Sequence, residues 1–345
     1  MNAEQTPQQI HDVLSRQRKY FSEGKTLPFA KREQYLLDLE NALVSHKDEV
    51  LHALHEDLNK PAMEAYLAEY YFLLQEIRLV RKSLKKWLKP EKVQSPIYFQ
   101  PCRSEICREP YGVALIVAPW NYPIQLAIAP LVSAIAAGNT VVLKPSELAT
   151  ASEALLVKLL EDVFPPELVR VQTGGADVAS ALLNERFDFI FFTGSTGIGK
   201  IIALKAAEYL TPCVLELGGK CPCVVDSTAD IKLAAGRILS GKFFNGGQTC
   251  FAPDFVVVHE SVKDELLSAM KRELELVPWH QEMSHVINGH HYQRLHKLLE
   301  NLTNDQIACS GEDDRNVCKM APRIVDGIDW DHALLQEEIF GPILP

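Results

Sequence analysis

The chain has 345 residues, of which 47% are hydrophobic, 23% charged and 8% aromatic, and 35 Lys+Arg against 45 Asp+Glu give a formal net charge of -10. These values are typical of a globular protein with one large α/β domain or two medium domains, and they exclude a disordered or fibrous chain. The acidic balance and the lack of a long basic block argue against nucleic acid as a partner. No window reaches the roughly 18 apolar residues of a membrane helix, and residues 1–16 do not resemble a secretory signal. We therefore expect a cytoplasmic protein without a membrane segment.

Eight cysteines are spread over the chain. Without a signal peptide, this spread favours reduced thiols over a disulfide framework, so that one of them could be reactive. Cys221 and Cys223 are one residue apart. This spacing fits neither a C-x-x-C redox pair nor a zinc pattern, and we interpret the two as packed thiols.

The first part of the chain, residues 8–87, is predicted to be helical. Apolar residues between positions 36 and 58 recur mostly at three- and four-residue steps, with charged residues on the other faces. Pro61 predicts the end of this helix, because a residue before proline is pushed away from the α region. A second helix is expected to begin near Met63.

From residue 90 the pattern changes, first to short extended pieces and then to alternating strands and helices. The extended pieces are predicted around 97–99 and 104–107. The expected strands are 113–117, 140–143, 168–172, 187–192 and 213–217, and the clearest helices are 124–137, with an interruption at Pro130, and 151–163. This alternation predicts an α/β fold with a doubly wound parallel sheet that binds ligands at the carboxyl ends of its strands. A second α/β unit is expected from about Thr211.

Three loops in the first unit place unusual residues at predicted strand ends. Asn121 presents an amide donor between two prolines, although it could equally cap the next helix. Lys144 can reach a ribose or a phosphate and Glu147 can accept from a ribose hydroxyl, or else Ser146 and Glu147 form an ordinary helix start. The glycines of 192–200 suit a phosphate at a helix N-terminus, but the G-x-x-G-x-G order is neither the usual dinucleotide fingerprint nor a P-loop.

Two further segments carry a carboxylate and a thiol. Glu216 lies in an apolar strand end followed by two glycines, where burial would make it a useful general base; the alternative is an ion pair with Lys220. Cys250 ends a small, polar turn, 244–250, which is a suitable position for a nucleophile. The alternative is a small core residue.

Together these segments closely resemble the aldehyde dehydrogenase superfamily. The resemblance is carried by five motifs, those around Asn121, Lys144, Gly194, Glu216 and Cys250. The segment 336–342 is similar to a sixth block of the same family, while 21–26 and 57–61 look like its class 3 branch. The resemblance covers essentially the whole chain.

The resemblance implies a catalytic set of three residues. Cys250 is expected to be the nucleophile, Asn121 the side-chain donor of an oxyanion hole, and Glu216 the base that activates water. In such a reaction a thiolate adds to an aldehyde, the thiohemiacetal gives hydride to a nicotinamide, and water hydrolyses the resulting thioester. One oxyanion donor is typically worth about 3 kcal/mol. No step needs a metal.

The resemblance also implies a set of cofactor-binding residues, namely Trp120, Lys144, Glu147, Gly194, Ser195, Gly199, Glu338 and Phe340. Lys144 and Glu147 would hold the adenosine ribose, and Glu338 the nicotinamide ribose. A carboxylate at Glu147 favours a free ribose 2′-hydroxyl, and therefore NAD, but the class 3 branch accepts both cofactors, so NADP is possible. Two positions depart from the usual family residues: Gly246 stands where alanine or serine is more common, and Cys221 where serine is common.

The predicted function is NAD(P)-dependent oxidation of a medium-chain aliphatic or aromatic aldehyde to the acid. We expect a dinucleotide-binding domain over 1–211, with an arm over 88–109 for a homodimer, and a catalytic domain over 212–345. Family chains continue past 337–342, so this second domain is expected to be incomplete at its C-terminal end. An inactive nucleotide-binding or interaction protein is therefore the alternative. A cysteine hydrolase would need a histidine partner for Cys250, which no motif announces.

Overall fold

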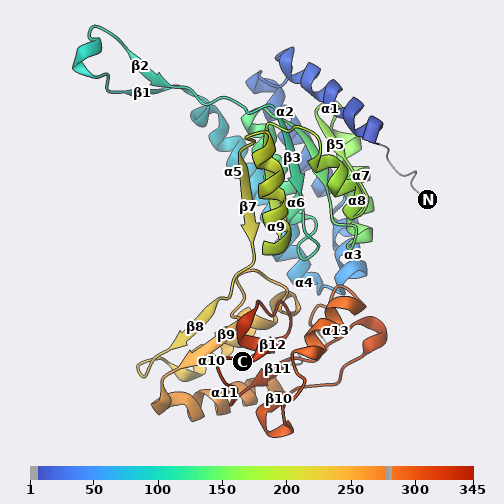
Figure 1. Cartoon of the computed structure of the whole chain (residues 1–345), viewed down its shortest axis with the longest axis vertical. Coiled ribbons are helices and arrows are strands. Elements are labelled where there is room, and N and C mark those ends of the chain that lie inside the picture. The colour runs from blue at the N-terminus through green and yellow to red at the C-terminus, as the bar shows by residue number, and fades with distance from the viewer. Residues whose placement is uncertain (1–6, 277, 279–281) are drawn as a thin grey trace. The chain divides into compact units, whose positions relative to one another are not determined.

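The structure is a computed structural model that describes residues 7–276, 278 and 282–345. Its packing divides the chain into two compact units. Unit 1 takes the described residues up to Leu51 together with Leu67–Glu216, and unit 2 takes His52–Tyr66 together with Leu217–Pro345 (Figure 1).

The two units differ at two places from the domains expected from the sequence. The second unit begins at Leu217 rather than at residue 212, and it also includes His52–Tyr66, which the sequence pattern places in the first domain. Contacts made by this early segment explain the difference. The Leu58 carbonyl accepts a hydrogen bond from the His285 N–H (2.7 Å), and Glu64 accepts one from the Asn245 N–H (3.1 Å).

The chain begins with helices, as predicted. They are α1 (Pro7–Ser22), α2 (Phe29–Ser45), α3 (Lys47–Leu58), α4 (Ala62–Glu64), the π-helical segment η1 (Ala65–Tyr71) and α5 (Phe72–Trp87). The helix predicted to end before Pro61 ends at Leu58, and the next begins at Ala62. The proline restriction on the preceding backbone accounts for this break.

Unit 1 is built on a five-stranded sheet. Its strands are β3 (Val113–Val117), β4 (Thr140–Lys144), β5 (Val169–Val171), β6 (Phe189–Gly194) and β7 (Cys213–Leu217), in the order β5-β4-β3-β6-β7. The strands β3 to β6 pair in parallel. This order reverses direction between β3 and β6, which defines the doubly wound fold that the sequence predicts and its topological switch point.

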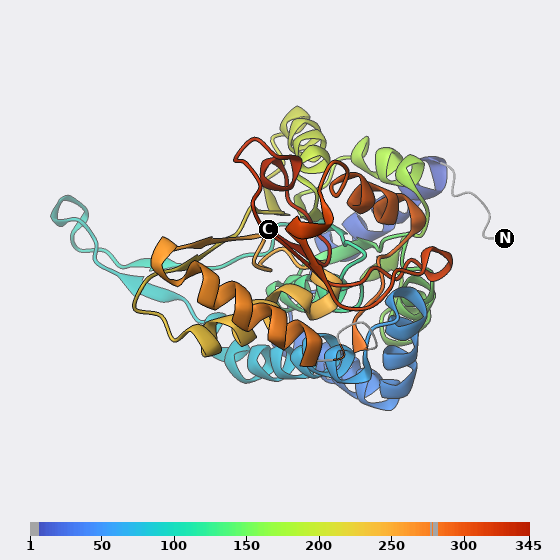
Figure 2. The same cartoon turned by 90° about the horizontal axis from the view of Figure 1, so that it is seen from below.

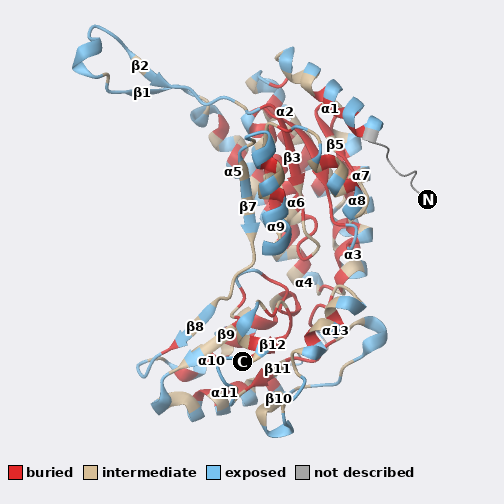
Figure 3. Ribbon diagram, in the orientation of Figure 1, coloured by how far each residue is buried: buried red, intermediate tan, exposed pale blue. Residues whose placement is uncertain are grey.

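Helices pack against this sheet and bury its central strands. They include α6 (Gln125–Ala137), α7 (Thr150–Val163) and α9 (Thr196–Glu208), while α8 (Ala176–Leu183) contacts α1 and α9. Helices α1 and α6 contact β3 and β4, whereas α7 contacts β5 and α9 contacts β6. Every residue of β4 is buried, as are the first four of β3, so the centre of the sheet forms the core of the unit (Figure 3).

Pro130 does not interrupt α6, contrary to the sequence-based expectation. The helix runs from Gln125 to Ala137 with Pro130 inside it. A proline inside a helix costs roughly 3 kcal/mol because it removes a hydrogen bond. Packing of α6 against β3, β4, α2 and α5 buries most of its apolar side chains and offsets that cost.

A hairpin projects from unit 1 between α5 and β3 (Figures 1 and 2). Strands β1 (Glu91–Val93) and β2 (Ser104–Ile106) pair in antiparallel fashion. The expected extended piece at Ile97–Phe99 is instead a 3₁₀ turn, η2, between the two strands. Ile97, Tyr98 and Phe99 are 79%, 92% and 69% exposed, so no core imposes an extended conformation on them.

Unit 2 has two small sheets of its own. Strands β8 (Pro222–Val225) and β9 (Phe255–Val258) are parallel, β10 (Ile307–Cys309) is antiparallel to β11 (Arg323–Val325), and β11 is parallel to β12 (Ile343–Leu344). The Val256 N–H donates to the Pro345 carbonyl (2.9 Å), which joins the two groups of strands. The helices are α10 (Ile231–Phe243), α11 (Lys263–Leu276), α13 (Gly289–Lys297) and α14 (Ala333–Gln336).

Short 3₁₀ turns connect these elements, namely η3 (Phe244–Gly247), η4 (Glu260–Val262), η5 (Asn304–Gln306) and η6 (Arg315–Val317). Helices α10 and α11 pack against each other and share a core cluster with β8 that includes Leu239, Phe243 and Met270. Among the described residues, no helix is both long and apolar enough to cross a lipid bilayer.

The N-terminus of α6 is capped by a carboxylate from another segment. Glu69, in η1, is fully buried, and its Oε2 accepts hydrogen bonds from the N–H groups of Ile124 (3.0 Å) and Gln125 (3.1 Å). A carboxylate at this end of a helix also interacts favourably with the helix dipole. Glu69 therefore fixes the start of the helix that follows the β3 loop.

We predict that Glu69→Ala destabilises the protein by about 2–4 kcal/mol, because two backbone N–H groups lose their acceptor inside the core. Urea denaturation of the variant and the wild type measures this difference. Gln75→Ala, at an exposed position of α5, is the matched control and should stay within about 0.5 kcal/mol. Equal stability of the two variants would contradict the capping role.

Candidate active site

The carboxyl ends of three strands in unit 1 bring the sequence-predicted residues of that unit to one edge of the sheet. Val117, at the end of β3, pairs with Lys144 on one side and Phe192 on the other. Gly194 is the last residue of β6, two residues beyond Phe192. The edge thus formed lies at the topological switch point, where doubly wound sheets bind their ligands.

Asn121 lies in the loop after β3 and is 5% exposed. The alternative expected from the sequence, in which Asn121 caps α6, does not apply, because Glu69 accepts from the first N–H groups of that helix. Trp120, the preceding residue, is half-buried. The capping residue, Glu69, lies 55 positions before Ile124, so no local sequence pattern could identify it.

Lys144 and Glu147 form an ion pair at the end of β4. The Lys144 Nζ donates to Glu147 Oε2 (2.9 Å) and to the Pro145 carbonyl (3.0 Å). The ammonium-bearing side chain is buried, whereas that of Glu147 is 43% exposed. Helix α7 begins only at Thr150, so Glu147 is not part of its first turn. The pair therefore offers a donor and an acceptor at the strand end.

The turn after β6 leads directly into α9. Ser195 is the N-cap of this helix, and its Oγ accepts from the Ile198 N–H (3.4 Å). Gly199 is buried, and its N–H donates to the Ser195 carbonyl (2.9 Å). Ser195 and Gly197 are exposed, and a Cβ atom on Gly197 would meet nothing within 4 Å. This is an open helix N-terminus of the kind that binds phosphate.

Glu216 does not have the environment expected from its sequence. The residue is exposed on β7, so the burial invoked for a general base is absent there. The strand lies at the edge of the sheet, and its side chains alternate between half-buried and exposed, with Glu216 on the exposed side. The alternative ion pair with Lys220 is also not formed, because the Lys220 Nζ bonds to Asp254.

Cys250 follows a turn with unusual backbone angles. Asn245, Gly246 and Gly247 have φ values of 54°, 61° and 74°. A Cβ atom on Gly247 would lie 2.2 Å from the Gly341 carbonyl oxygen, and one on Gly246 would lie 2.6 Å from that of Ser284. Residues 245–249 are buried, whereas Cys250 is exposed. The alternative role of Cys250 as a core residue is therefore excluded.

Gln248 holds this turn together, a role that no local sequence pattern indicated. Its Nε2 donates to the carbonyls of Asn245 (3.0 Å) and His285 (2.9 Å), and its Oε1 accepts from the Ile287 N–H (3.1 Å). The side chain is fully buried. The turn that carries Cys250 is thus fastened to the segment 284–287 by both ends of one amide.

Glu64 supports the other end of the same turn. Its Oε2 accepts from the Asn245 N–H (3.1 Å) and the Ser284 hydroxyl (3.4 Å). Burial raises the pKa of Glu64 to about 7, although these hydrogen bonds and the charge of Lys60 act in the opposite direction. The base of the turn therefore contains a carboxyl group that titrates near neutral pH.

Glu338 lies against the glycine pair that follows β7. Its Oε1 accepts from the Gly219 N–H (3.3 Å), and a Cβ atom on Gly218 would lie only 1.9 Å from its Oε2. Burial raises the pKa of Glu338. Phe340, two residues later, has a φ of 51°. Gly218 is therefore required for Glu338 to reach this position.

A buried ion cluster fixes the loop that contains Glu338. Asp254 accepts from the ammonium groups of Lys220 (2.5 Å) and Lys242 (3.5 Å) and from the Ile339 N–H (3.1 Å). Lys220 also donates to the carbonyl of Glu337 (2.9 Å). Burial lowers the pKa of Lys242 to about 8, against the opposing effect of Asp254. Single-sequence patterns gave no signal for this cluster.

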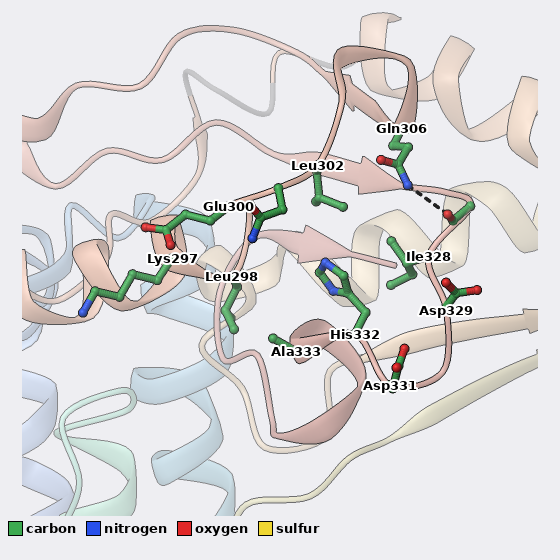
Figure 4. A pocket seen from close by; sticks show the side chains of 12 residues that line it. Lys297, Leu298, Glu300, Leu302, Gln306, Ile328, Asp329, Asp331, His332 and Ala333 are labelled. Atoms are coloured by element: carbon green, nitrogen blue, oxygen red, sulfur yellow. Dashed lines mark hydrogen bonds between the residues drawn. The ribbon is translucent and has the colours of Figure 1, made fainter.

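An open pocket of about 320 Å³ lies elsewhere in unit 2 (Figure 4). It is lined by residues that include Lys297, Leu302, Gln306, Asp331 and His332, and it contains none of the predicted site residues. The Gln306 Nε2 donates to the Gly327 carbonyl across its edge (2.8 Å). The pocket has no part in the site described above.

Comparison with known proteins agrees with the motifs. The model of the aldehyde dehydrogenase family matches residues 2–345. The chain is 43% identical over 341 residues to aldehyde dehydrogenase family 3 member H1 of Arabidopsis thaliana, covering 97% of this chain and 70% of that protein. It is 39% identical over 341 residues to the dimeric NADP-preferring aldehyde dehydrogenase of Canis lupus familiaris, covering 97% and 75%.

A solved structure described as the substrate-bound state of Staphylococcus aureus AldH has the same fold. It superposes with a TM-score of 0.94 at 41% identity, over 97% of this chain and 74% of that one. The chain belongs to the aldehyde dehydrogenase family, with relatives in its family 3 branch, and it is an oxidoreductase. The α/β fold class and the resemblance found in the sequence are thereby confirmed.

We predict that Gly247→Ala destabilises the protein by about 2 kcal/mol or more, because the new Cβ atom meets a backbone carbonyl and the residue has a positive φ. Urea denaturation gives the change in the free energy of unfolding. Gly236→Ala, in α10 where an added Cβ atom meets nothing within 4 Å, is the control and should be neutral or stabilising by up to about 1 kcal/mol. A neutral Gly247→Ala variant would refute the close approach.

The raised pKa of Glu64 predicts a pH-dependent stability. Below its unfolded-state pKa of 4.5 the group is protonated in both states; between that value and about 7 only the unfolded state releases the proton, so stability falls as pH rises. The total loss is on the order of 3 kcal/mol. Urea denaturation from pH 4.5 to 8 should show this slope, and Glu64→Gln should remove it. An unchanged slope in the variant would disprove the assignment.

Proposed function

We propose that the protein oxidises medium-chain aliphatic or aromatic aldehydes to carboxylic acids, with Cys250 as the nucleophile and NAD or NADP as the cofactor. The observation that carries this proposal is the exposed thiol of Cys250 at the end of a buried, rigid turn. Rigid support of an accessible nucleophile is what covalent catalysis requires.

Three residues, Cys250, Asn121 and Glu216, have separate roles in the proposed reaction. The Cys250 thiolate adds to the aldehyde carbon, and the Asn121 amide donates to the oxygen on which negative charge develops. A bound nicotinamide would supply the acceptor for the hydride that leaves this carbon. Glu216 then takes a proton from the water that hydrolyses the thioester on Cys250. The roles of Asn121 and Glu216 rest on the motifs in which they lie.

The residues of unit 1 fit the adenosine half of a dinucleotide. Glu147 follows the second strand of the doubly wound sheet, where a carboxylate typically accepts from a ribose 2′-hydroxyl. Lys144 can donate to the same ribose. Ser195 and the exposed start of α9 suit the pyrophosphate. The Thr193 Oγ1 is buried at the end of β6 without a hydrogen-bond partner among the described residues, so this edge retains unused polar capacity.

The residues of unit 2 fit the nicotinamide half. Glu338 has its carboxylate fixed by the Gly219 N–H, and one of its oxygens can accept from a ribose hydroxyl. Phe340 provides an aromatic surface for the nicotinamide. We assign the dinucleotide-binding role to unit 1, together with Trp120 and Gly199, and the catalytic role to unit 2.

The hairpin of unit 1 is assigned to homodimer formation. Its apolar side chains are exposed in the single chain, and Ile97, Tyr98 and Phe99 would be covered by a second copy. The relative of known oligomeric state reported above is dimeric. Family membership and the presence of every motif residue favour an enzyme over the inactive nucleotide-binding alternative.

We predict that the purified protein forms NADH or NADPH when a medium-chain or aromatic aldehyde is added, and that Cys250→Ala lowers the rate by at least about 10³-fold. Absorbance of the reduced nicotinamide measures the rate. Cys309→Ala, which removes another exposed thiol, is the control and should keep wild-type activity. Undiminished turnover by Cys250→Ala would overturn the proposed mechanism.

Glu147→Gln is predicted to shift the cofactor preference toward NADP. Loss of the carboxylate removes repulsion of a 2′-phosphate, so the ratio of kcat/KM for NADP to that for NAD should rise by about tenfold. Steady-state kinetics with both cofactors give this ratio. Glu161→Gln, in the neighbouring helix α7, is the control; a preference that stays the same in Glu147→Gln would exclude the assigned contact.

A further inference from the structure

Cys221 lies beside Cys250, although the two are 29 residues apart in the sequence. The Cys221 Sγ donates to the Cys250 carbonyl oxygen at 3.4 Å. The backbone carbonyl of Cys221 accepts from the Asp254 N–H (2.8 Å). Two separate contacts therefore hold Cys221 alongside the segment that begins with Cys250.

The local structure restricts how far the two residues can separate. The pairing of β8 with β9 begins at Pro222 and Phe255, one residue beyond the backbone contact between Cys221 and Asp254. On the other side, the Ala252 N–H donates to the Thr249 carbonyl (3.1 Å), which places Cys250 within a tight turn. The Cys250 side chain and the carbonyl group that Cys221 contacts are attached to the same α-carbon, so the Cys221 thiol lies next to the residue that carries the second thiol.

Gly219 leaves room for such an approach. A Cβ atom on Gly219 would lie 3.6 Å from the Cys221 Sγ and 4.0 Å from the Cys250 carbonyl oxygen. A larger residue at this position would therefore occupy the space next to both cysteines. The absence of a side chain leaves that space open for movement of the Cys221 thiol.

Two other thiols of unit 2, those of Cys223 and Cys318, are less suitable partners for Cys250. Cys223 packs against the core cluster of α10 and α11, and burial raises its pKa. Cys318 packs against the second cluster, which contains Leu295 and Ile343, and burial raises its pKa as well. Cys221 is the cysteine whose sulfur contacts residue 250 directly.

We propose that Cys221 is a resolving thiol that protects the nucleophile Cys250 as a reversible disulfide when peroxide is present. The step balances as two reactions. The Cys250 thiolate attacks hydrogen peroxide, which oxidises the sulfur to a sulfenic acid and releases hydroxide. The Cys221 thiol then attacks this sulfur, the S–S bond forms, and the hydroxyl group leaves as water with the proton of the thiol.

The consequence is a thiol that is blocked but not destroyed. A cysteine sulfenic acid that meets no second thiol is oxidised further to the sulfinic acid, which is irreversible in most proteins. A disulfide instead returns to two thiols when a thiol reductant is added. The importance of Cys250 as a nucleophile rests on the proposed function, whereas formation of the disulfide can be tested without any turnover.

The test compares the full chain with Cys221→Ser, after treatment with a small molar excess of hydrogen peroxide. Unreacted thiols are alkylated, and peptides are analysed by mass spectrometry without reduction. We expect a Cys221–Cys250 linked peptide in the wild type, and sulfinic acid at Cys250 in the variant. After reduction with dithiothreitol, the fraction of Cys250 whose thiol can be labelled again should be about tenfold higher in the wild type than in the variant.

Several results would overturn the proposal. They are linkage of Cys250 to Cys223, linkage between two chains, or equal recovery of labelling in wild type and Cys221→Ser. Cys223→Ser serves as the matched control and should form the linked peptide as the wild type does. The two proposals can fail separately. If peroxide gives the linked peptide but the reduced protein shows no aldehyde-dependent formation of NADH or NADPH, the disulfide is supported and the proposed function is rejected.

Discussion

Asp254, a buried carboxylate of unit 2, joins three segments that are far apart in the sequence. Its oxygens accept from the ammonium groups of Lys220 and Lys242 and from the Ile339 N–H. Two ammonium groups this close would repel each other, and a buried charge without its partner typically costs about 3–5 kcal/mol. Because Lys220 follows the glycine pair and Ile339 follows Glu338, the carboxylate sets the distance between these two parts of the site. The turn that carries Cys250 lies just before Asp254, so the ion cluster also holds the end of this turn in place.

In unit 1 the order of the strands, rather than an ion cluster, positions the site residues. The switch between β3 and β6 places the ends of β3, β4 and β6 side by side, and hydrogen-bonded register determines which residues face each other there. Lys144 is held beside Val117 by the sheet rather than by a loop. A site built on strand ends is positioned more accurately than one on free loops. Backbone pairing therefore positions the site residues of unit 1, and a buried ion cluster positions those of unit 2.

The sequence predicted the strands of unit 1 well because their signals are local. Apolar runs bounded by turn residues gave β3 at Val113–Val117 and β7 at Cys213–Leu217 with their observed bounds. It failed where packing overrides local preference, as at Pro130 inside α6, and where no packing acts, as at the exposed turn Ile97–Phe99. Glu216 was expected to be buried because its neighbours are apolar, but the side chains of β7 alternate between half-buried and exposed, and Glu216 is on the exposed side.

The sequence by itself determined the family, the doubly wound fold and the identity of the motif residues, because periodicity and short motifs are properties of neighbouring residues. Only the tertiary structure decided that Glu69 caps α6, that Glu64 supports the turn before Cys250, and that the thiol of Cys221 rests on the Cys250 carbonyl. Each of these contacts joins segments distant in the chain. Their hydrogen bonds and shifted pKa values depend on burial and on partners that no local pattern contains.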